Sequence, residues 1–331
     1  MNDQGPFFAA LDFGTGGAKC AIFDMAGQRL AVAREAWSYE SAPHEHEQLN
    51  RGARFEPQAF WSALARCCQR AVAEADVPAS GIAAVASSAQ RLGTVFLDAS
   101  DTEVFAAPNI DGRGLAGGFE IMETLDVKRA VQIGGHWPPM ISSLARLLSF
   151  QRDANAPRVS RILTLNDWMN FRLSGEVASE ASNAGESMLL DIASRSWSQE
   201  ILELFRVEEK LLPPLLEPGS ALGRVSPQAA EETGLLAGTP VVVGGADTQC
   251  ALLGASVLEE GHAAAVLGTT TPVMVAEATA RFDKNGKLWS GCHVLGNRWT
   301  IESNVGDTGN AFEWLLSLLG LEGTTHEINF V

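Results

Sequence analysis

The first chemistry-bearing stretch joins an acid to a glycine-rich turn. Asp12 follows the apolar run 7–11 and precedes Gly14, Thr15 and Gly16, with Lys19 shortly after. Glycines permit positive φ and let backbone N–H groups converge on an anion, while Thr15 adds a hydroxyl. Asp12 is placed to hold Mg²⁺, which keeps waters and takes few carboxylates. The pattern predicts either a phosphate-binding turn beside a metal or an ordinary hairpin with an acid at its edge.

The spacing separates this turn from two common phosphate motifs. A P-loop requires G-x-x-x-x-G-K-[ST], which Gly14 and Lys19 do not fit. In a G-x-G-x-x-G frame starting at Gly14, Lys19 occupies the place of the last glycine, and the residues after it are typical of a strand. A hairpin tip is therefore expected, and a dinucleotide-binding dehydrogenase is disfavoured.

A second acid, Asp247, follows the apolar run 241–243 and a predicted turn at Gly244-Gly245. Asp is a favoured helix N-cap, and a helix is expected over 248–254. A carboxylate at the carboxyl end of a strand also lies where α/β proteins place their ligands. There it can take a proton from an attacking hydroxyl, so the sequence leaves N-cap and general base as equal alternatives.

Two further stretches carry polar groups in possible loops. Residues 268–271, Gly-Thr-Thr-Thr, form a second hydroxyl-rich turn that can face the first across a cleft. Asp111 and Arg113 can hydrogen-bond a polyol, although these two residues alone favour a surface salt bridge.

The elements that must position these residues follow an α/β order. Strands are expected over 7–11, 19–23 and 30–33 as an antiparallel meander, followed by a helix over 57–75 and a strand over 82–86. Residues 112–216 are expected to be mainly helical, and a new unit to begin at Thr239. The second Gly-Thr turn lies between expected strands 263–267 and 272–276. This repeats the pattern of the first turn, as one duplicated unit would.

Composition narrows the class of protein. The chain has 331 residues, 46% of them hydrophobic, and a net charge of −16. That charge argues against a nucleic acid or an anionic membrane as partner, because both select clustered Lys and Arg. The five cysteines form no C-x-x-C pair and suit reduced thiols. With no apolar run of membrane-spanning length and no signal-peptide pattern, a cytoplasmic protein is expected.

Taken in order, these pieces resemble the FGGY family of carbohydrate kinases, within the actin and hexokinase-like ATPase superfamily. The xylulokinase branch is the most similar, and the autoinducer-kinase and fuculokinase branches are alternatives. The resemblance implies two α/β, ribonuclease-H-like domains made from one duplicated unit, over 1–238 and 239–331, with the second incomplete. The matching stretches are DFGTGGAK (12–19), AQRLG (89–93), NIDGR (109–113), residues 167–191, SRSW (194–197), GTPVVVGGADTQ (238–249), LGTTT (267–271) and CHVLGNRW (292–299).

The resemblance also implies roles for single residues. Asp247 matches the family's catalytic base, which would deprotonate a hydroxyl of a ketose or polyol as it attacks the γ-phosphoryl group of ATP. Mg²⁺ would lie near Asp12. The ATP phosphates would bind between Gly14, Thr15, Gly16 and Lys19 on one side and Gly268, Thr269 and Thr270 on the other. The sugar would contact Gln90, Arg91, Asp111, Arg113, Asp247 and Thr248.

Two departures from the family pattern qualify this expectation. The tryptophan common ahead of the Asp-x-Arg element is absent from residues 107–110. The chain also stops before a glycine-rich adenine-binding segment, so a truncated kinase is expected. Its uncovered second domain would favour self-association, as in a homodimer. The alternatives are a catalytically incompetent remnant that binds sugar or a partner, and an actin-like ATPase without a sugar substrate.

Overall fold

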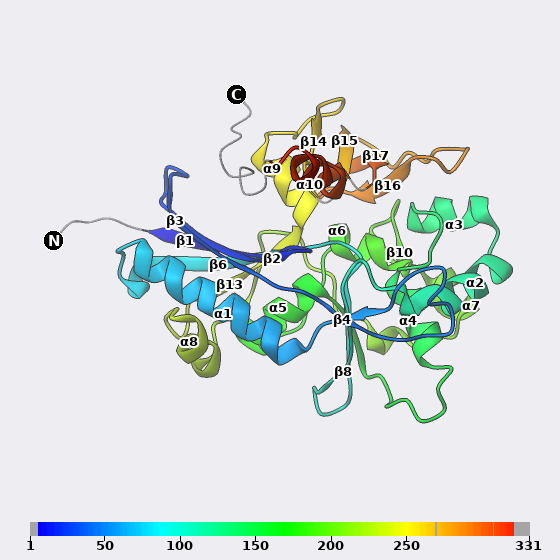
Figure 1. The fold of residues 1–331 in the computed structure, drawn as a ribbon, viewed down its shortest axis with the longest axis horizontal. Coiled ribbons are helices and arrows are strands. Elements are labelled where there is room, and N and C mark those ends of the chain that lie inside the picture. The colour runs from blue at the N-terminus through cyan, green and yellow to red at the C-terminus, as the bar shows by residue number, and fades with distance from the viewer. Residues whose placement is uncertain (1–5, 269, 307, 321–331) are drawn as a thin grey trace.

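A computed structural model describes residues 6–268, 270–306 and 308–320. Within these ranges a run of five strands precedes the first α-helix, and groups of helices and strands follow (Figure 1). The strands are β1 (Phe7–Phe13), β2 (Gly17–Phe23), β3 (Arg29–Ala36), β4 (Glu40–Ser41), β5 (Ala53–Arg54), β6 (Ile82–Ala89), β7 (Thr94–Leu97), β8 (Glu103–Ala107), β9 (Arg161–Thr164), β10 (Leu190–Asp191), β11 (Ser196–Trp197), β12 (Ala221–Arg224), β13 (Pro240–Ala246), β14 (Ala263–Ala265), β15 (Thr271–Glu277), β16 (Trp289–Cys292) and β17 (Trp299–Val305). The α-helices are α1 (Pro57–Glu74), α2 (Leu115–Thr124), α3 (Val127–Gly134), α4 (Ser143–Phe150), α5 (Leu165–Ser174), α6 (Ala181–Ala184), α7 (Gln199–Leu204), α8 (Pro227–Thr233), α9 (Asp247–Gly254) and α10 (Thr308–Leu318).

A six-stranded sheet in the order β12-β13-β6-β1-β2-β3 forms the centre of the first half. The strands β1, β2 and β3 make the antiparallel meander that the sequence predicts, and β1, β6 and β13 run parallel. Helices α1 and α5 pack against one face of this sheet, with Trp61 and Trp168 in the shared core. This order is that of a ribonuclease-H-like domain, which confirms the predicted fold class.

The second sheet, β14-β15-β17-β16, is antiparallel and starts at Ala263. In Figure 1 it lies above the first sheet, on the side away from α1 and α5. The strand β13 belongs to the first sheet, because it pairs with β6 and β12. The predicted boundary after Gly238 therefore falls inside the first sheet, and the change of sheet comes between α9 and β14.

An aromatic cluster supports the hairpin that joins β1 to β2. Phe13, the last residue of β1, is fully buried, and its ring centroid lies 4.5 Å from that of Trp37. Phe55, Phe60 and Trp168 complete the cluster. Burying a ring of this size stabilises the fold by about 1.5–3 kcal/mol, so the base of the hairpin is rigid.

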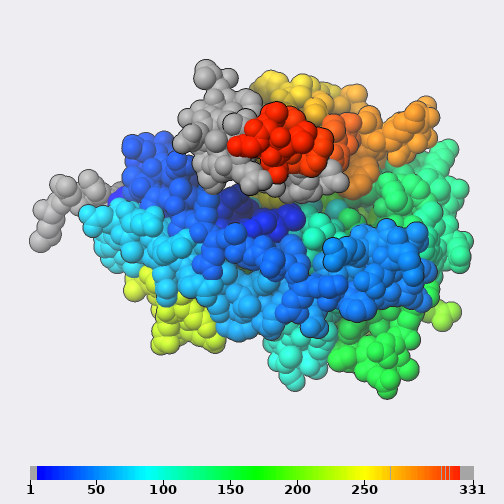
Figure 2. Space-filling model, in the orientation of Figure 1, coloured from blue at the N-terminus to red at the C-terminus, as the bar shows by residue number. Residues whose placement is uncertain are grey.

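Helix α10 carries large apolar side chains on its outer surface. Trp314 is 65% exposed and Leu318 is 66% exposed. Figure 2 shows the red surface of α10 near the top of the view, above the blue surface of the first part of the chain. The apolar surface expected from an incomplete second domain, and the homodimer, stay predictions. No helix in the described ranges is long and apolar enough to cross a bilayer.

Candidate active site

The carboxyl ends of three parallel strands bring the two acids of the sequence analysis to one edge. Asp12 of β1 and Gly245 of β13 both pair with Ser88 of β6, so they lie in one row across the sheet. Asp247 comes two residues after Gly245, at the first position of α9. Ligands of open α/β sheets bind at this edge.

The glycines before Asp247 lie in the strand, not in the predicted turn. A Cβ on Gly244 would lie 1.7 Å from the carbonyl oxygen of Ser87, so no other residue permits this approach of β13 to β6. The register between the two strands shifts between Val242 and Gly245. The irregularity sets where β13 ends, and therefore where Asp247 leaves the sheet.

Asp247 is not the N-cap of α9. The cap is Ala246, and no side chain caps this end of the helix. The Oδ1 atom of Asp247 accepts a hydrogen bond of 2.8 Å from the backbone N–H of Thr248. The carboxylate thus lies in the first turn, where the helix dipole favours negative charge. The N-cap alternative is therefore wrong.

The hairpin tip is held from two sides. The indole of Trp37 donates to the carbonyl oxygen of Thr15 at 3.1 Å, and Nδ2 of Asn109 donates to Thr15 Oγ1 at 3.0 Å. The tip glycines do not adopt the positive φ that the sequence suggested. Gly16 faces open space, because a Cβ there would meet no atom within 4 Å. The tip can therefore admit a ligand close to its backbone.

A cavity of about 620 Å³ lies against this tip. It is lined on one side by the hairpin, including Gly14, Thr15, Gly16 and Lys19, and on the other by α9 and Gly268. Asp12 and Asp247 form part of its wall. The structure thus brings together the predicted phosphate-binding residues of both turns, apart from two. Thr269 lies outside the described residues, and Thr270 lines the neighbouring cavity described below.

The surroundings of Asp12 fit a hydrated magnesium ion. Its Oδ1 accepts a hydrogen bond of 2.9 Å from Ser88 Oγ, and its Oδ2 lies 3.3 Å from Lys19 Nζ. The carboxylate is partly exposed to the cavity. Among the described residues no group of three or more His, Cys, Asp or Glu side chains forms a metal cage. One accessible carboxylate suits Mg²⁺, which takes its other ligands from water and phosphate.

A second cavity, of about 380 Å³, adjoins the first. Both cavities are lined by Thr15, Asp247, Val266 and Gly268. Polar groups of the second cavity come from Arg91, Asn109, Thr248, Thr270 and Asn304, and its apolar wall includes Leu92, Ile110, Ile141 and Trp289. Mixed walls of this kind suit a small polyol with an apolar portion. Asp247 is therefore accessible from both cavities.

The electrostatic setting of Asp247 favours proton transfer near neutral pH. Burial raises the pKa of its carboxyl group to about 7. The positive charge of Arg91 opposes this rise in pKa, and the negative charge of Asp12 adds to it. A general base works best when its pKa lies near the working pH. Asp247 thus has the pKa expected of a base.

Of the predicted sugar-binding residues, Arg91 and Thr248 line the second cavity. Gln90 is buried, and its side chain instead hydrogen-bonds to two neighbouring segments. Its Nε2 donates to Tyr39 Oη at 2.9 Å, and its Oε1 accepts from the backbone N–H of Asn109 at 3.2 Å. Gln90 therefore supports the residues beside the cavity and contributes no wall to it.

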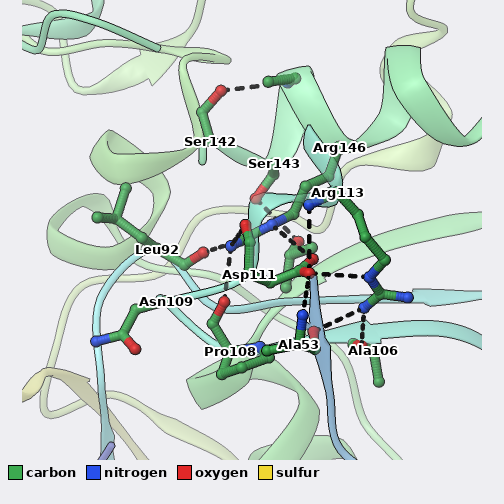
Figure 3. Close-up of polar contacts among 12 residues, drawn as sticks. Ala53, Leu92, Ala106, Pro108, Asn109, Asp111, Arg113, Ser142, Ser143 and Arg146 are labelled. Carbon is green, nitrogen blue, oxygen red and sulfur yellow. Dashed lines mark hydrogen bonds and ion pairs between the residues drawn. The ribbon is translucent and has the colours of Figure 1, made fainter. Parts of the chain in front are cut away.

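Asp111 and Arg113 line neither cavity. Figure 3 shows their polar contacts with each other and with Arg146. Asp111 is fully buried and pairs with Arg113, so the expected salt bridge forms, but in the interior and not at the surface. Its Oδ1 accepts from the backbone N–H of Ala53 at 2.8 Å and from Arg113 Nε at 2.9 Å, and its Oδ2 lies 3.6 Å from Arg146 Nε. Arg113 also donates to the carbonyl oxygens of Ala53 and Ala106, so the pair connects β5 to β8. The Arg146 contact from α4 adds charge attraction but no hydrogen bond, because Asp111 Oδ2 has no hydrogen-bond partner in the described structure.

Asn109 lines the second cavity where Asp111 was expected to, and it was not among the site residues expected from the sequence. Figure 3 shows its side chain pointing away from the Asp111 cluster. Its Oδ1 atom is buried and has no hydrogen-bond partner, and the residue lines the second cavity. Its place in the NIDGR stretch was a signal. The contact of Ser88 with Asp12 depends on pairing across the sheet and left no local signal.

A ribonuclease-H-like sheet with two carboxylates and a Gly-Thr hairpin at one edge is the arrangement of the actin and hexokinase-like fold class. Residues 7–254 match the FGGY family of carbohydrate kinases, N-terminal domain. The match covers well over half of the chain, so this protein belongs to the FGGY family of carbohydrate kinases.

The proteins that are similar to this chain are named as kinases of several different substrates. The chain is 32% identical to an autoinducer-2 kinase of Salmonella typhimurium over 94% of its own length, and 32% identical to the autoinducer-2 kinase of Yersinia enterocolitica. It covers 59% of either relative, so it spans little more than half of their length. Xylulose kinase from Rhodospirillum rubrum has the same fold, with a TM-score of 0.83 at 23% identity, over 97% of this chain and 65% of that one. Gluconate kinase from Lactobacillus acidophilus has a TM-score of 0.84 at 16% identity, over 97% and 64% of the two chains.

Proposed function

We propose that this protein transfers the γ-phosphoryl group of ATP to a hydroxyl of a small ketose or polyol. The observation that carries the proposal is the position of Asp247, which lines both the cavity against the glycine hairpin and the second, mixed cavity. A base at the boundary of two cavities can face a hydroxyl in one and a phosphoryl group in the other. The membership in a family of carbohydrate kinases supports the same assignment.

In this mechanism Asp247 takes the proton of the acceptor hydroxyl. The hydroxyl oxygen forms a bond to the γ-phosphorus, the bond from that phosphorus to the β,γ-bridging oxygen breaks, and ADP leaves with those electrons. A positioned base contributes about 10²–10⁴-fold to such a step. Most of the remainder comes from positioning and from charge stabilisation.

The phosphate chain would bind to the hairpin tip, with Thr15, Gly16 and Lys19 on one side and Gly268 on the other. Asp12 would hold Mg²⁺ through water, and the ion would neutralise charge on the phosphate oxygens when bound. Ser88 keeps the Asp12 carboxylate in one orientation. Lys19 adds a mobile positive charge, since its side chain is half-exposed.

The acceptor would bind in the second cavity, with Asn109, Arg91 and Thr248 as polar partners. The unpaired Oδ1 of Asn109 supplies a hydrogen-bond acceptor for a hydroxyl. The names of the relatives suggest four acceptors to test, namely autoinducer-2, xylulose, gluconate and glycerol.

The test is a coupled kinase assay over these acceptors, run beside calorimetric titration with MgATP. Turnover of one acceptor with stoichiometric ADP supports the proposal. Binding of an acceptor without ATP binding would instead support the remnant hypothesis. An ADP release rate that is the same with and without acceptor would support an ATPase.

A further inference from the structure

A buried ion pair connects the two sheets beside the acceptor cavity. Arg91 follows β6 of the first sheet, and Glu302 lies on β17 of the second. The Nη1–Oε2 distance is 2.5 Å and the Nη2–Oε1 distance is 2.8 Å, so the pair is bidentate. The Glu302 side chain is only 3% exposed. Such parallel bonds fix the plane of a guanidinium group as well as its position.

The pair belongs to a larger cluster. Glu186 Oε1 lies 3.2 Å from Arg91 Nη1, and Glu186 Oε2 lies 3.3 Å from His136 Nδ1. The His136 ring stacks on Trp289 of β16, with centroids 4.7 Å apart. The second sheet is therefore contacted at two adjacent points, by Arg91 after β6 through an ion pair and by His136 after α3 through a ring stack.

The charges in this cluster are unequal. Two carboxylates face one guanidinium, and Asp247 adds a third negative charge nearby. Burial alone would lower the pKa of Arg91, but the negative charges of Glu186 and Glu302 raise its pKa above the usual value. Arg91 therefore remains charged despite its burial.

Among the four ionisable members of the cluster, only Arg91 lines the acceptor cavity in the described part of the chain. Glu302 reaches that cavity only through Arg91, although its neighbour Asn304 lines it directly. A buried pair contributes little net stability compared with apolar packing, and the best-attested use of such pairs is to specify one arrangement.

We propose that Glu302 is a positioning residue: it reaches from the second sheet to hold Arg91 at the wall of the acceptor cavity, so that the acceptor site is complete only when the two sheets are docked. Arg91, which follows the first sheet, would thereby contact the acceptor in an orientation that Glu302 of the second sheet sets. The statement about the acceptor rests on the proposed function, whereas the docking statement does not.

The first test needs no ligand. Hydrogen–deuterium exchange of the whole chain is compared for wild type, Glu302→Gln and Glu260→Gln. The control also removes a carboxylate paired with an arginine, since Glu260 Oε1 lies 2.9 Å from Arg281 Nη2, but this pair is exposed. We expect faster exchange in residues 289–292 and 299–305 of Glu302→Gln only. Unchanged exchange in these two strands, or an equal change in Glu260→Gln, would overturn the docking statement.

The second test uses xylulose and MgATP as probes, or another acceptor from the kinase screen if xylulose is not turned over. Glu302→Gln should raise the KM for the acceptor about tenfold, a usual size for coupling between sites, and leave the KM for MgATP unchanged. In a double-mutant cycle with Arg91→Gln, the second substitution should add little to the first. Additive effects, or equal increases in both KM values, would show a merely structural role for Glu302. If wild type turns over no acceptor, the proposed function fails, and the exchange experiment still decides the docking of the sheets.

Discussion

Asp12 and Asp247 leave the same edge of the central sheet on either side of strand β6. Asp12 is paired with Ser88, and Asp247 follows two residues after Gly245, which is paired with that same serine. Both carboxylates line one cavity, and the negative charge of Asp12 contributes to the raised pKa of Asp247. The sheet register thus places a candidate metal carboxylate beside a candidate base, and the following predictions depend on that arrangement.

The first prediction concerns the pH dependence of phosphoryl transfer. Because burial raises the pKa of Asp247 to about 7, the base is protonated in acid, and kcat should fall as pH drops below about 7. Arg91 lowers this pKa, so Arg91→Gln should move the acidic limb to higher pH. The check is a pH–rate profile of both proteins between pH 5 and 9. An acidic limb near pH 4 in wild type would contradict the assignment.

The second prediction concerns magnesium. Asp12→Asn removes the charge of the candidate metal carboxylate, so the Mg²⁺ concentration for half-maximal activity should rise by about tenfold or more. Glu35→Gln serves as the control, because Glu35 lines the same cavity but forms an ion pair with Arg66. Magnesium titrations at fixed ATP separate the two variants. Equal Mg²⁺ requirements in Asp12→Asn and wild type would exclude Asp12 from the metal site.

The third prediction concerns Asn109. Its amide bonds to Thr15 of the hairpin, and its carbonyl oxygen has no protein partner. A lost hydrogen bond of about 1 kcal/mol corresponds to a roughly fivefold increase in the acceptor KM of Asn109→Ala. Asn155→Ala, at an exposed turn, is the control. Steady-state kinetics should show this increase for Asn109→Ala alone, and unchanged acceptor KM values would exclude the contact.

The fourth prediction is that Asp111 stabilises the fold and does not bind the acceptor. Asp111→Ala leaves Arg146 buried and Arg113 largely buried without their carboxylate, a change that costs about 3–5 kcal/mol. Glu120→Ala, which breaks an exposed pair with Arg152, should cost under about 1 kcal/mol. Urea unfolding measures both free energies. Normal stability with a raised acceptor KM in Asp111→Ala would restore the sugar-contacting role.

The sequence predicted the elements whose signals are local. The meander β1–β3 and helix α1 follow from short apolar runs, a turn and helical periodicity, and the two Gly-Thr stretches indicated two turns facing one cavity. The sheet to which β13 belongs was not predictable, because its pairing with β6 joins residues about 150 positions apart in the chain. A local pattern contains no information about such partners.

The site residues divide in the same way. Asp247 could be placed at a strand end from its neighbours, but its second cavity depends on residues from both sheets. Asp111 and Arg113 alone favoured a surface salt bridge, and only the family resemblance placed them at the sugar. The buried Arg146, 35 residues away from Asp111, helps to hold that carboxylate in the fold. Burial of this kind can be recognised only when the helix that covers it is known.

The proposed phosphoryl transfer depends most directly on Asp247 as the general base. The decisive measurement is the single-turnover rate of phosphoryl transfer in Asp247→Asn, with MgATP and acceptor both saturating. Folding is monitored by thermal melting at pH 8. The pKa of Asp247 is raised to about 7 in the folded protein, so its protonated form stabilises the fold below pH 4 and this contribution is lost as pH rises through 7. At pH 8 the ionised carboxylate therefore lowers the stability of the wild type. The variant should therefore be more stable than wild type by about 1 kcal/mol. We predict a rate about 10²–10⁴-fold below wild type with binding of ATP and acceptor retained. A rate within about threefold of wild type would contradict the assignment of Asp247 as general base, because a positioned base contributes far more than threefold.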